Sequence, residues 1–180
     1  MPSDTAPRRA PTLSLLLAAA IVVLDQIAKL AVVANMVPGG RHEVIRGWFQ
    51  IRFITNAGGL FGSFRDLPDG WRTVLFSAVP LLASVGLLIF LLRTSSVQRR
   101  LRTGLALILG GAVGNLVDRL RLGYVIDYLD VYWREHHWPA FNVADASICV
   151  GVGLILLDAF LGPTREPEPS PAPSDGSVSG

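Results

Sequence analysis

Val74 to Leu92 are nineteen consecutive residues without a charge. About 20 mainly apolar residues are enough for a helix to cross the hydrocarbon core of a bilayer. Only 17% of the chain is charged, against about 25% in soluble domains. The sequence therefore predicts one integral membrane domain over 12–162. Its four expected transmembrane helices lie at about 13–34, 72–92, 103–122 and 143–161.

Residues 35–71 follow a different pattern. Pro38-Gly39-Gly40 ends the first helix, and Phe49 to Phe53 alternate between apolar and polar side chains, as in a half-buried strand. Aromatic side chains gather here, and amphipathic rings prefer the membrane interface. The sequence thus predicts a small extramembrane sheet, cradle or amphipathic segment. Its aromatic residues are Trp48, Phe49, Phe53, Phe61, Phe64 and Trp71.

The two ends of the chain are polar. Residues 1–11 include two arginines, and residues 163–180 are rich in proline and serine, which predicts a disordered tail. Four crossings place both ends on one side. Four arginines between Arg93 and Arg102 favour the cytoplasm for that side. Segments 35–71 and 120–142 should then share the outer face.

The first apolar run has an alternative interpretation as a cleaved signal peptide, since a basic start precedes it. The run is too long for the apolar core of such a peptide. It also contains Asp25 and Lys29. These two residues are spaced i, i+4, so an ion pair within the helix is the simplest interpretation. An ion pair inside a span is expected to face the bundle or its mouth.

Carboxylates beside apolar spans are costly, so they are functional candidates. Asp118 has Arg119 beside it and Arg121 three residues on, which favours a charged structural anchor. Asp127 has apolar neighbours on both sides. Such surroundings raise the pKa of a carboxyl group, as a catalytic acid requires.

Asp145 stands at the start of the last span, three residues after Asn142. Asn142 is a plausible N-cap, and a helix N-terminus favours negative charge. This pair could therefore be a helix cap and nothing more. If Asp127 and Asp145 meet, they would share a proton, so that one activates water while the other protonates a substrate carbonyl. That arrangement hydrolyses a peptide bond without a metal or cofactor.

Other polar features carry less information. Asn115, Asp118 and Arg119 share one face of a helix end. Gly110 and Gly114 allow another helix to approach closely, or serve packing alone. His136-His137 is not a convincing metal pair, because adjacent side chains point apart, and we expect a solvent-exposed loop. The single cysteine, Cys149, lies in an apolar run and is expected to be buried.

Five blocks of the sequence resemble those of bacterial lipoprotein signal peptidase, the signal peptidase II family of aspartic endopeptidases. They occur in the family's order over about residues 13–160. The blocks are Leu24-Asp25-Gln26-Ile27-Ala28-Lys29, Asn56-Ala57-Gly58-Gly59-Leu60-Phe61, Gly110-Gly111-Ala112-Val113-Gly114-Asn115-Leu116-Val117-Asp118-Arg119, Val125-Ile126-Asp127-Tyr128 and Phe141-Asn142-Val143-Ala144-Asp145. One departure is Gly59-Leu60, where the family usually has alanines after the glycine, so the substrate groove is expected to differ slightly.

The resemblance implies an all-α integral membrane protein of the bacterial inner membrane, with four spans, a periplasmic β-cradle and its active site on the periplasmic face. It implies removal of signal peptides from diacylglyceryl-modified prolipoproteins at the bond before the lipidated cysteine, with inhibition by globomycin. The catalytic aspartates fall on Asp127 and Asp145. Supporting and substrate-contacting positions fall on Asp25, Lys29, Asn56, Gly58, Asn115, Asp118, Arg119 and Asn142.

Two other classes of function compete with hydrolysis. A small transporter or proton-conducting protein would use the same acids as a relay, and a membrane scaffold would use them as caps and ion pairs. A relay predicts polar residues at mid-span in several helices, whereas the span at 74–92 has no charge. The net charge of +2 gives no reason to expect a nucleic-acid partner.

Overall fold

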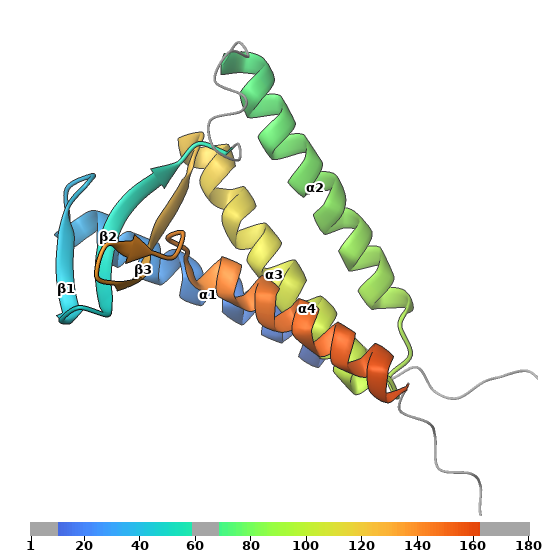
Figure 1. Ribbon diagram of the computed structural model, residues 1–180. Coiled ribbons are helices and arrows are strands. Elements are labelled where there is room, and N and C mark those ends of the chain that lie inside the picture. Colours follow the sequence, from blue (N-terminus) through green and yellow to red (C-terminus); the bar gives the residue numbers. More distant parts are fainter. Residues whose placement is uncertain (1–10, 59–68, 163–180) are drawn as a thin grey trace, which may run out of the picture.

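The computed structural model describes residues 11–58 and 69–162, which form four helices and a four-stranded sheet (Figure 1). Predictions for the two tails, for Phe61 and Phe64, and for Gly59-Leu60 lie outside the described residues. The elements are α1 (Thr12–Asn35), β1 (Arg41–Ile45), β2 (Phe49–Asn56), α2 (Asp69–Arg93), α3 (Arg99–Leu122), β3 (Val125–Trp133), β4 (His136–His137) and α4 (Val143–Leu161).

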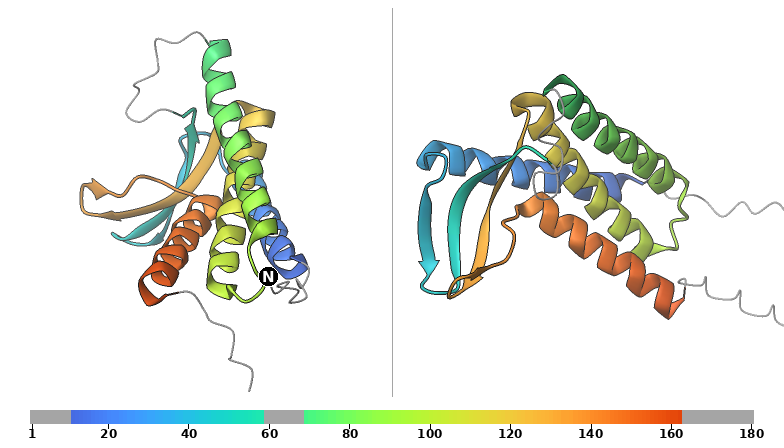
Figure 2. Two further views of the ribbon diagram at one scale, coloured as in Figure 1. Left: turned by 90° about the vertical axis from the view of Figure 1, so that its right-hand side faces the viewer. Right: turned by 45° about the horizontal axis from the view of Figure 1, so that its top comes forward.

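Helix α3 packs against each of the other three helices. The sheet lies at one end of the bundle, and the α2–α3 connection and the end of α4 lie at the other (Figure 2). Glycines allow the close packing. A Cβ atom on Gly110 would lie 2.7 Å from the backbone oxygen of Ala18 in α1, and one on Gly114 would lie 2.8 Å from the Asp25 carboxylate. The predicted helix contact through Gly110 and Gly114 is therefore confirmed.

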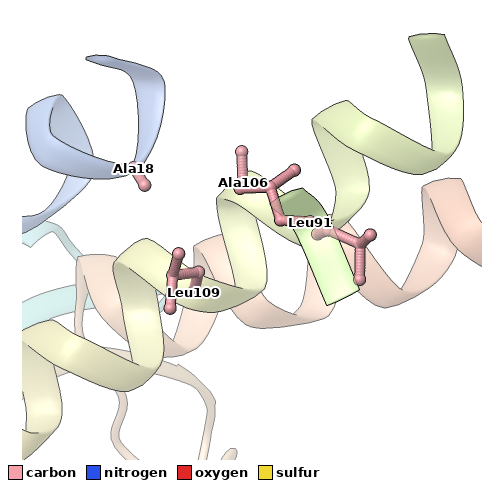
Figure 3. Packing of buried hydrophobic residues seen from close by; sticks show 5 residues of the cluster. Ala18, Leu91, Ala106 and Leu109 are labelled. Carbon is pink, nitrogen blue, oxygen red and sulfur yellow. The ribbon is translucent and has the colours of Figure 1, made fainter. Parts of the chain in front are cut away.

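The bundle exposes apolar side chains and buries few of them, as a lipid-facing protein does. Leu13, Leu82 and Phe160 are among the many exposed large apolar residues. The main buried cluster is small and joins α1, α2 and α3 through Ala18, Leu91, Leu105, Ala106 and Leu109 (Figure 3). Cys149 is exposed, so the prediction that it is buried is wrong. Its side chain faces outward from α4 instead of packing against α3.

Three helical segments of the described chain are long and apolar enough to cross a membrane: Thr12–Asn35, Val74–Arg93 and Val143–Leu161. The chain is therefore a multi-pass membrane protein. The expected span at 103–122 corresponds to α3, which has 24 residues, as α1 does, but carries charged residues near both ends. A fourth crossing by α3 stays a prediction.

The sheet is antiparallel, in the order β1-β2-β3-β4. Strands β1 and β2 confirm the strand expected within 35–71, but the four-stranded sheet is larger than predicted, and the expectation of an all-α protein is wrong. Strand β3 comes from a segment for which no strand was expected, and it pairs with β2 so that Asp127 lies opposite Ile54. His136 and His137 form the short strand β4, not a loop, because their backbones pair with Trp133 and Tyr132.

Candidate active site

Asp127 lies on β3 with only 3% of its surface exposed. Its two carboxylate oxygens accept hydrogen bonds from Asn142 Nδ2 at 2.8 Å and from Asn56 Nδ2 at 2.9 Å. Burial raises the pKa of Asp127 to about 6, and the nearby charge of Asp145 adds to this, while the two asparagine hydrogen bonds oppose it. The predicted rise in the pKa of Asp127 is therefore confirmed.

Asp145 lies in the first turn of α4 and forms a capping box with Asn142. The Asp145 amide donates to Asn142 Oδ1 at 2.9 Å, and the Asn142 amide donates to Asp145 Oδ2 at 3.2 Å. The predicted N-cap is thus confirmed. The cap does not account for all of the contacts of Asp145, because Asn115 Nδ2 donates to its Oδ1 at 2.7 Å.

The two aspartates are joined through two asparagines. Asn142 Nδ2 lies within hydrogen-bond distance of both Asp127 Oδ1 and, at 3.1 Å, Asn115 Oδ1. Asn115 in turn donates to Asp145. Asp127 and Asp145 are therefore linked at the same end of the bundle, where β3 and the start of α4 come together (Figure 1).

A buried ionic cluster is joined to this pair through Asn115. Lys29 Nζ forms ion pairs of 2.7 Å with both Asp25 and Asp118 and donates to Asn115 Oδ1 at 3.0 Å. The predicted ion pair of Asp25 and Lys29 is confirmed. Asp118 is paired with Lys29, however, and not with its neighbouring arginines, because α1 and α3 bring the lysine to it across the bundle.

The cluster also fixes the backbone on either side of the aspartate pair. Asp25 Oδ1 accepts from the backbone N–H of Ala144 at 3.0 Å, and Asp118 Oδ2 accepts from that of Ile126 at 3.2 Å. These residues immediately precede Asp145 and Asp127. The cluster therefore holds both aspartates in place through their own chain neighbours.

Gln26 was missed as a site residue. Its side-chain amide donates to Asp118 Oδ1 at 2.9 Å and to the Gly114 backbone oxygen at 3.3 Å. The available signal was a third polar residue in the first span, beside Asp25. Gly58 was expected on the resemblance alone. Its N–H donates to Asn56 Oδ1 at 3.0 Å, which orients Asn56 toward Asp127.

Arg119 lies close enough to interact electrostatically with Asp145, Asp127 and Asp118. Its Nη1 reaches the Asn115 backbone oxygen at 3.5 Å, while its buried Nε has no hydrogen-bond partner in the described segments. The guanidinium thus contributes positive charge to the surroundings of the two carboxylates.

A second polar cluster, also missed, lies within the sheet. Asp130 is buried and accepts from Gln50 Nε2 at 2.7 Å, and His137 Nδ1 lies 2.9 Å from its other oxygen. These contacts tie β4 and β2 to β3. No group of three histidine, cysteine, aspartate or glutamate side chains suited to a metal ion occurs within residues 11–58 and 69–162.

Fold and site together define a class: multi-pass membrane proteins with two linked carboxylates where a helix bundle meets an extramembrane sheet. The chain belongs to the signal peptidase II family, since the family model described as "Signal peptidase (SPase) II" matches residues 17–161. This is an aspartic peptidase family, so the chain is an enzyme of that type.

Curated relatives and solved structures agree with this assignment. A lipoprotein signal peptidase of Geobacter metallireducens is 45% identical over 145 residues, which cover 81% of this chain and 88% of that protein. One of Symbiobacterium thermophilum is 42% identical over 149 residues, covering 83% and 95%. A bacterial membrane enzyme solved by the in meso method at 1.9 Å has a TM-score of 0.73 and 27% identity, covering 82% of this chain and 92% of that one.

Proposed function

We propose that Asp127 and Asp145 are the catalytic pair of this lipoprotein signal peptidase. The protein cleaves signal peptides from prolipoproteins. Within that activity, we assign the cut to the bond before the lipid-modified cysteine of a diacylglyceryl prolipoprotein. The observation that carries the assignment to the two aspartates is their linkage through Asn142 and Asn115.

The geometry supports a division of roles between the aspartates. The pKa of Asp127 is raised to about 6 by burial, which favours this residue as the holder of the shared proton. Asp145 lies at the positive end of α4, where a negative charge is stabilised, and is suited to act as the base. Asp145 then takes a proton from water, and the resulting hydroxide attacks the scissile carbonyl carbon.

Asp127 donates its proton to the carbonyl oxygen as the tetrahedral intermediate forms. Collapse of the intermediate breaks the C–N bond, and the proton that Asp145 took from water passes to the leaving amine. One hydroxyl of the intermediate returns its proton to Asp127 as the new carboxyl group forms. Asn115, Asn142 and Asn56 hold the carboxylates, while Arg119 positions the substrate backbone. Asp25, Lys29, Asp118 and Gly58 support these groups.

The site suits a substrate whose signal helix lies among the spans and whose lipid chains stay in the bilayer. Exposed backbone is unfavourable in the hydrocarbon core. The scissile bond should therefore lie near the interface, where water reaches the pair. The arginines at the opposite end of the bundle, Arg93 to Arg102, favour the cytoplasm for that end. We accordingly place the site on the periplasmic face of the inner membrane, with α3 as the fourth crossing.

Cleavage of a diacylated prolipoprotein by purified Asp127→Asn and Asp145→Asn variants tests the assignment. We expect rates lower by about 10²- to 10⁴-fold in each variant, the usual contribution of a general acid or base. Globomycin should inhibit the wild-type protein. Asp158→Asn is the matched control, because Asp158 is also a buried acid of α4 but pairs with Arg100 at the far end. Folded variants of Asp127 or Asp145 that cleave at the wild-type rate would refute the proposal.

A further inference from the structure

The end of the bundle farthest from the aspartate pair carries unbalanced positive charge. Here the end of α2, the start of α3 and the end of α4 come together (Figure 2). The described residues at this end include four arginines and one carboxylate, that of Asp158. The arginines are Arg93, Arg99, Arg100 and Arg102.

Arg100 and Arg102 differ in what they contact. Arg100 Nε lies 3.1 Å from Asp158, and its Nη2 donates to the Gly162 backbone oxygen at 3.3 Å. Arg102 is only 8% exposed, yet its side chain has no hydrogen bond or ion pair within the described segments, and its Nε is buried without a partner. A buried guanidinium nitrogen without an acceptor is costly, which favours binding of an acceptor here.

The position of Arg102 shows where that acceptor would lie. Arg102 is one helical turn before Ala106 on α3. Ala106 itself clusters with Leu91 of α2 and Ala18 of α1 (Figure 3). Helical side chains lean toward the N-terminus of their helix. This geometry directs the Arg102 side chain toward the start of α3, and in the described part of the chain no contact joins it to Asp158.

The start of α3 lacks a side-chain cap and an acidic residue. Gln98 makes no side-chain capping bond, and the first turn contains no acidic residue. The first turn holds Arg99, Arg100 and Arg102 instead. Cations repel the positive end of a helix, whose free N–H groups favour an anion. Two independent features, the uncapped helix start and the unpaired buried arginine, thus call for negative charge at one place.

We propose that this place binds the phosphate of an anionic phospholipid headgroup, with Arg102 as its main ligand. The N–H groups of Arg100 and Leu101 would be further donors, since those of Arg99 and Arg102 already bond to Val97 and Gln98. A guanidinium can bind phosphate through two parallel hydrogen bonds. Basic pockets between transmembrane helices on the cytoplasmic side are suited to such headgroups. Exposed apolar residues of α2 supply a surface for acyl chains: Leu82, Val85, Ile89 and Leu92.

The test measures thermal unfolding of the delipidated full-length protein in neutral detergent at fixed ionic strength. Phosphatidylglycerol, phosphatidylcholine or sodium phosphate is added separately. We expect phosphatidylglycerol alone to raise the Tm, by about 5 °C at saturation. A shift of equal size with sodium phosphate or phosphatidylcholine would overturn the assignment to an anionic lipid.

Two variants separate binding from general charge attraction. Arg102→Gln should lose the phosphatidylglycerol shift and retain at least threefold less of this lipid in native mass spectrometry. Arg93→Gln should keep both, because Arg93 is an exposed cation at the same end. Equal losses in the two variants would mean that no defined site exists.

A third variant tests whether the unpaired charge of Arg102 only destabilises the fold. Arg102→Leu removes the unpaired charge and keeps much of the buried volume. If no headgroup binds, Arg102→Leu should have a higher Tm than the wild type in phosphatidylglycerol and in phosphatidylcholine alike, and the proposal fails. If a headgroup binds, adding phosphatidylglycerol should raise the Tm of the wild type relative to that of Arg102→Leu, and adding phosphatidylcholine should not.

Discussion

Asn142 donates a hydrogen bond of 2.8 Å to Asp127, while its own Oδ1 caps the helix that carries Asp145. One fully buried side chain thus contacts both aspartates, one through its amide nitrogen and the other through its oxygen. The geometry of the aspartate pair and the start of α4 are therefore set by the same residue.

Replacing Asn142 should separate these two roles. Serine caps a helix about as well as asparagine, whereas alanine loses about 1 kcal/mol of stability. Neither residue can donate to Asp127 as Asn142 does. We expect both variants to cleave about 10- to 100-fold more slowly, as for the loss of a hydrogen bond to a charged group. Asn142→Ala should also unfold more readily than Asn142→Ser, because only serine keeps the helix cap. Wild-type cleavage by Asn142→Ser would contradict the role in the pair.

The raised pKa of Asp127 makes stability depend on pH. The carboxyl titrates near 3.8 when unperturbed and near 6 in the folded protein. The folded state therefore binds a proton more tightly, and the stability this gives is full below about pH 4 and lost as the pH rises through about 6. The loss is about 3 kcal/mol at about 1.4 kcal/mol per pKa unit. Unfolding in detergent from pH 4 to 8 should show it.

Asp127→Asn provides the comparison for this measurement. The amide does not titrate, so the free energy of unfolding of the variant should fall less between pH 4 and 8 than that of the wild type. Acids that do not interact with Asp127 contribute equally to both proteins and cancel in the difference. Parallel stability curves for the two proteins would show that Asp127 titrates normally in the folded state.

The sequence indicated those features that depend on residues close together in the chain. The apolar spans, the Asp25–Lys29 pair and the Asn142–Asp145 cap are all set within four residues or within one helix. The apolar neighbours of Asp127 also correctly indicated its raised pKa. Local patterns sufficed for the ion pair and the cap because helix geometry fixes which neighbours meet.

Contacts across the fold were harder to foresee. Asp118 has two arginines nearby in sequence, but its ionic partner is Lys29, 89 positions away, because α1 packs against α3. Strand β3 was missed because its start, Val125 to Tyr128, is buried throughout and lacks the alternation of a half-exposed strand. The Asp130 contacts with Gln50 and His137 depend on that strand and were missed with it.

The ion pairs of Lys29 with Asp25 and Asp118 should dominate the stability of the end of the bundle near the sheet. Lys29→Met would leave the Asp25 and Asp118 carboxylates buried without their cation, at a cost of about 3–5 kcal/mol. Thermal unfolding should show a large drop in Tm. Arg121→Gln is the control, since Arg121 is exposed and makes only a 3.4 Å contact to Gln26. Adding Asp118→Asn to Lys29→Met should restore part of the loss; no recovery would argue against charge as the cause.

Asn56 should set the pH at which cleavage declines. Its hydrogen bond lowers the pKa of Asp127. If Asp127 is the acid, kcat/KM falls as Asp127 loses its proton, and Asn56→Ala should move that fall to higher pH. Thr55→Ala, at the preceding position of β2, should leave the pH dependence of kcat/KM unchanged. An unshifted profile for Asn56→Ala, with activity retained, would count against Asp127 as the proton donor.

Gly58 should be intolerant of any side chain for two separable reasons. Its φ is +81°, and a Cβ atom would lie 2.8 Å from the ring of Phe76. Gly58→Ala therefore combines backbone strain with a steric clash, and displacement of its N–H would release Asn56 from its orientation toward Asp127.

Gly47→Ala is the matched control, because Gly47 has φ +80° with no atom within 4 Å of its Cβ position. Both variants should lose about 1 kcal/mol of stability from strain, but only Gly58→Ala should also cleave more slowly, by about tenfold or more. Equal cleavage by the two variants would mean that the Gly58 turn does not position Asn56 for catalysis.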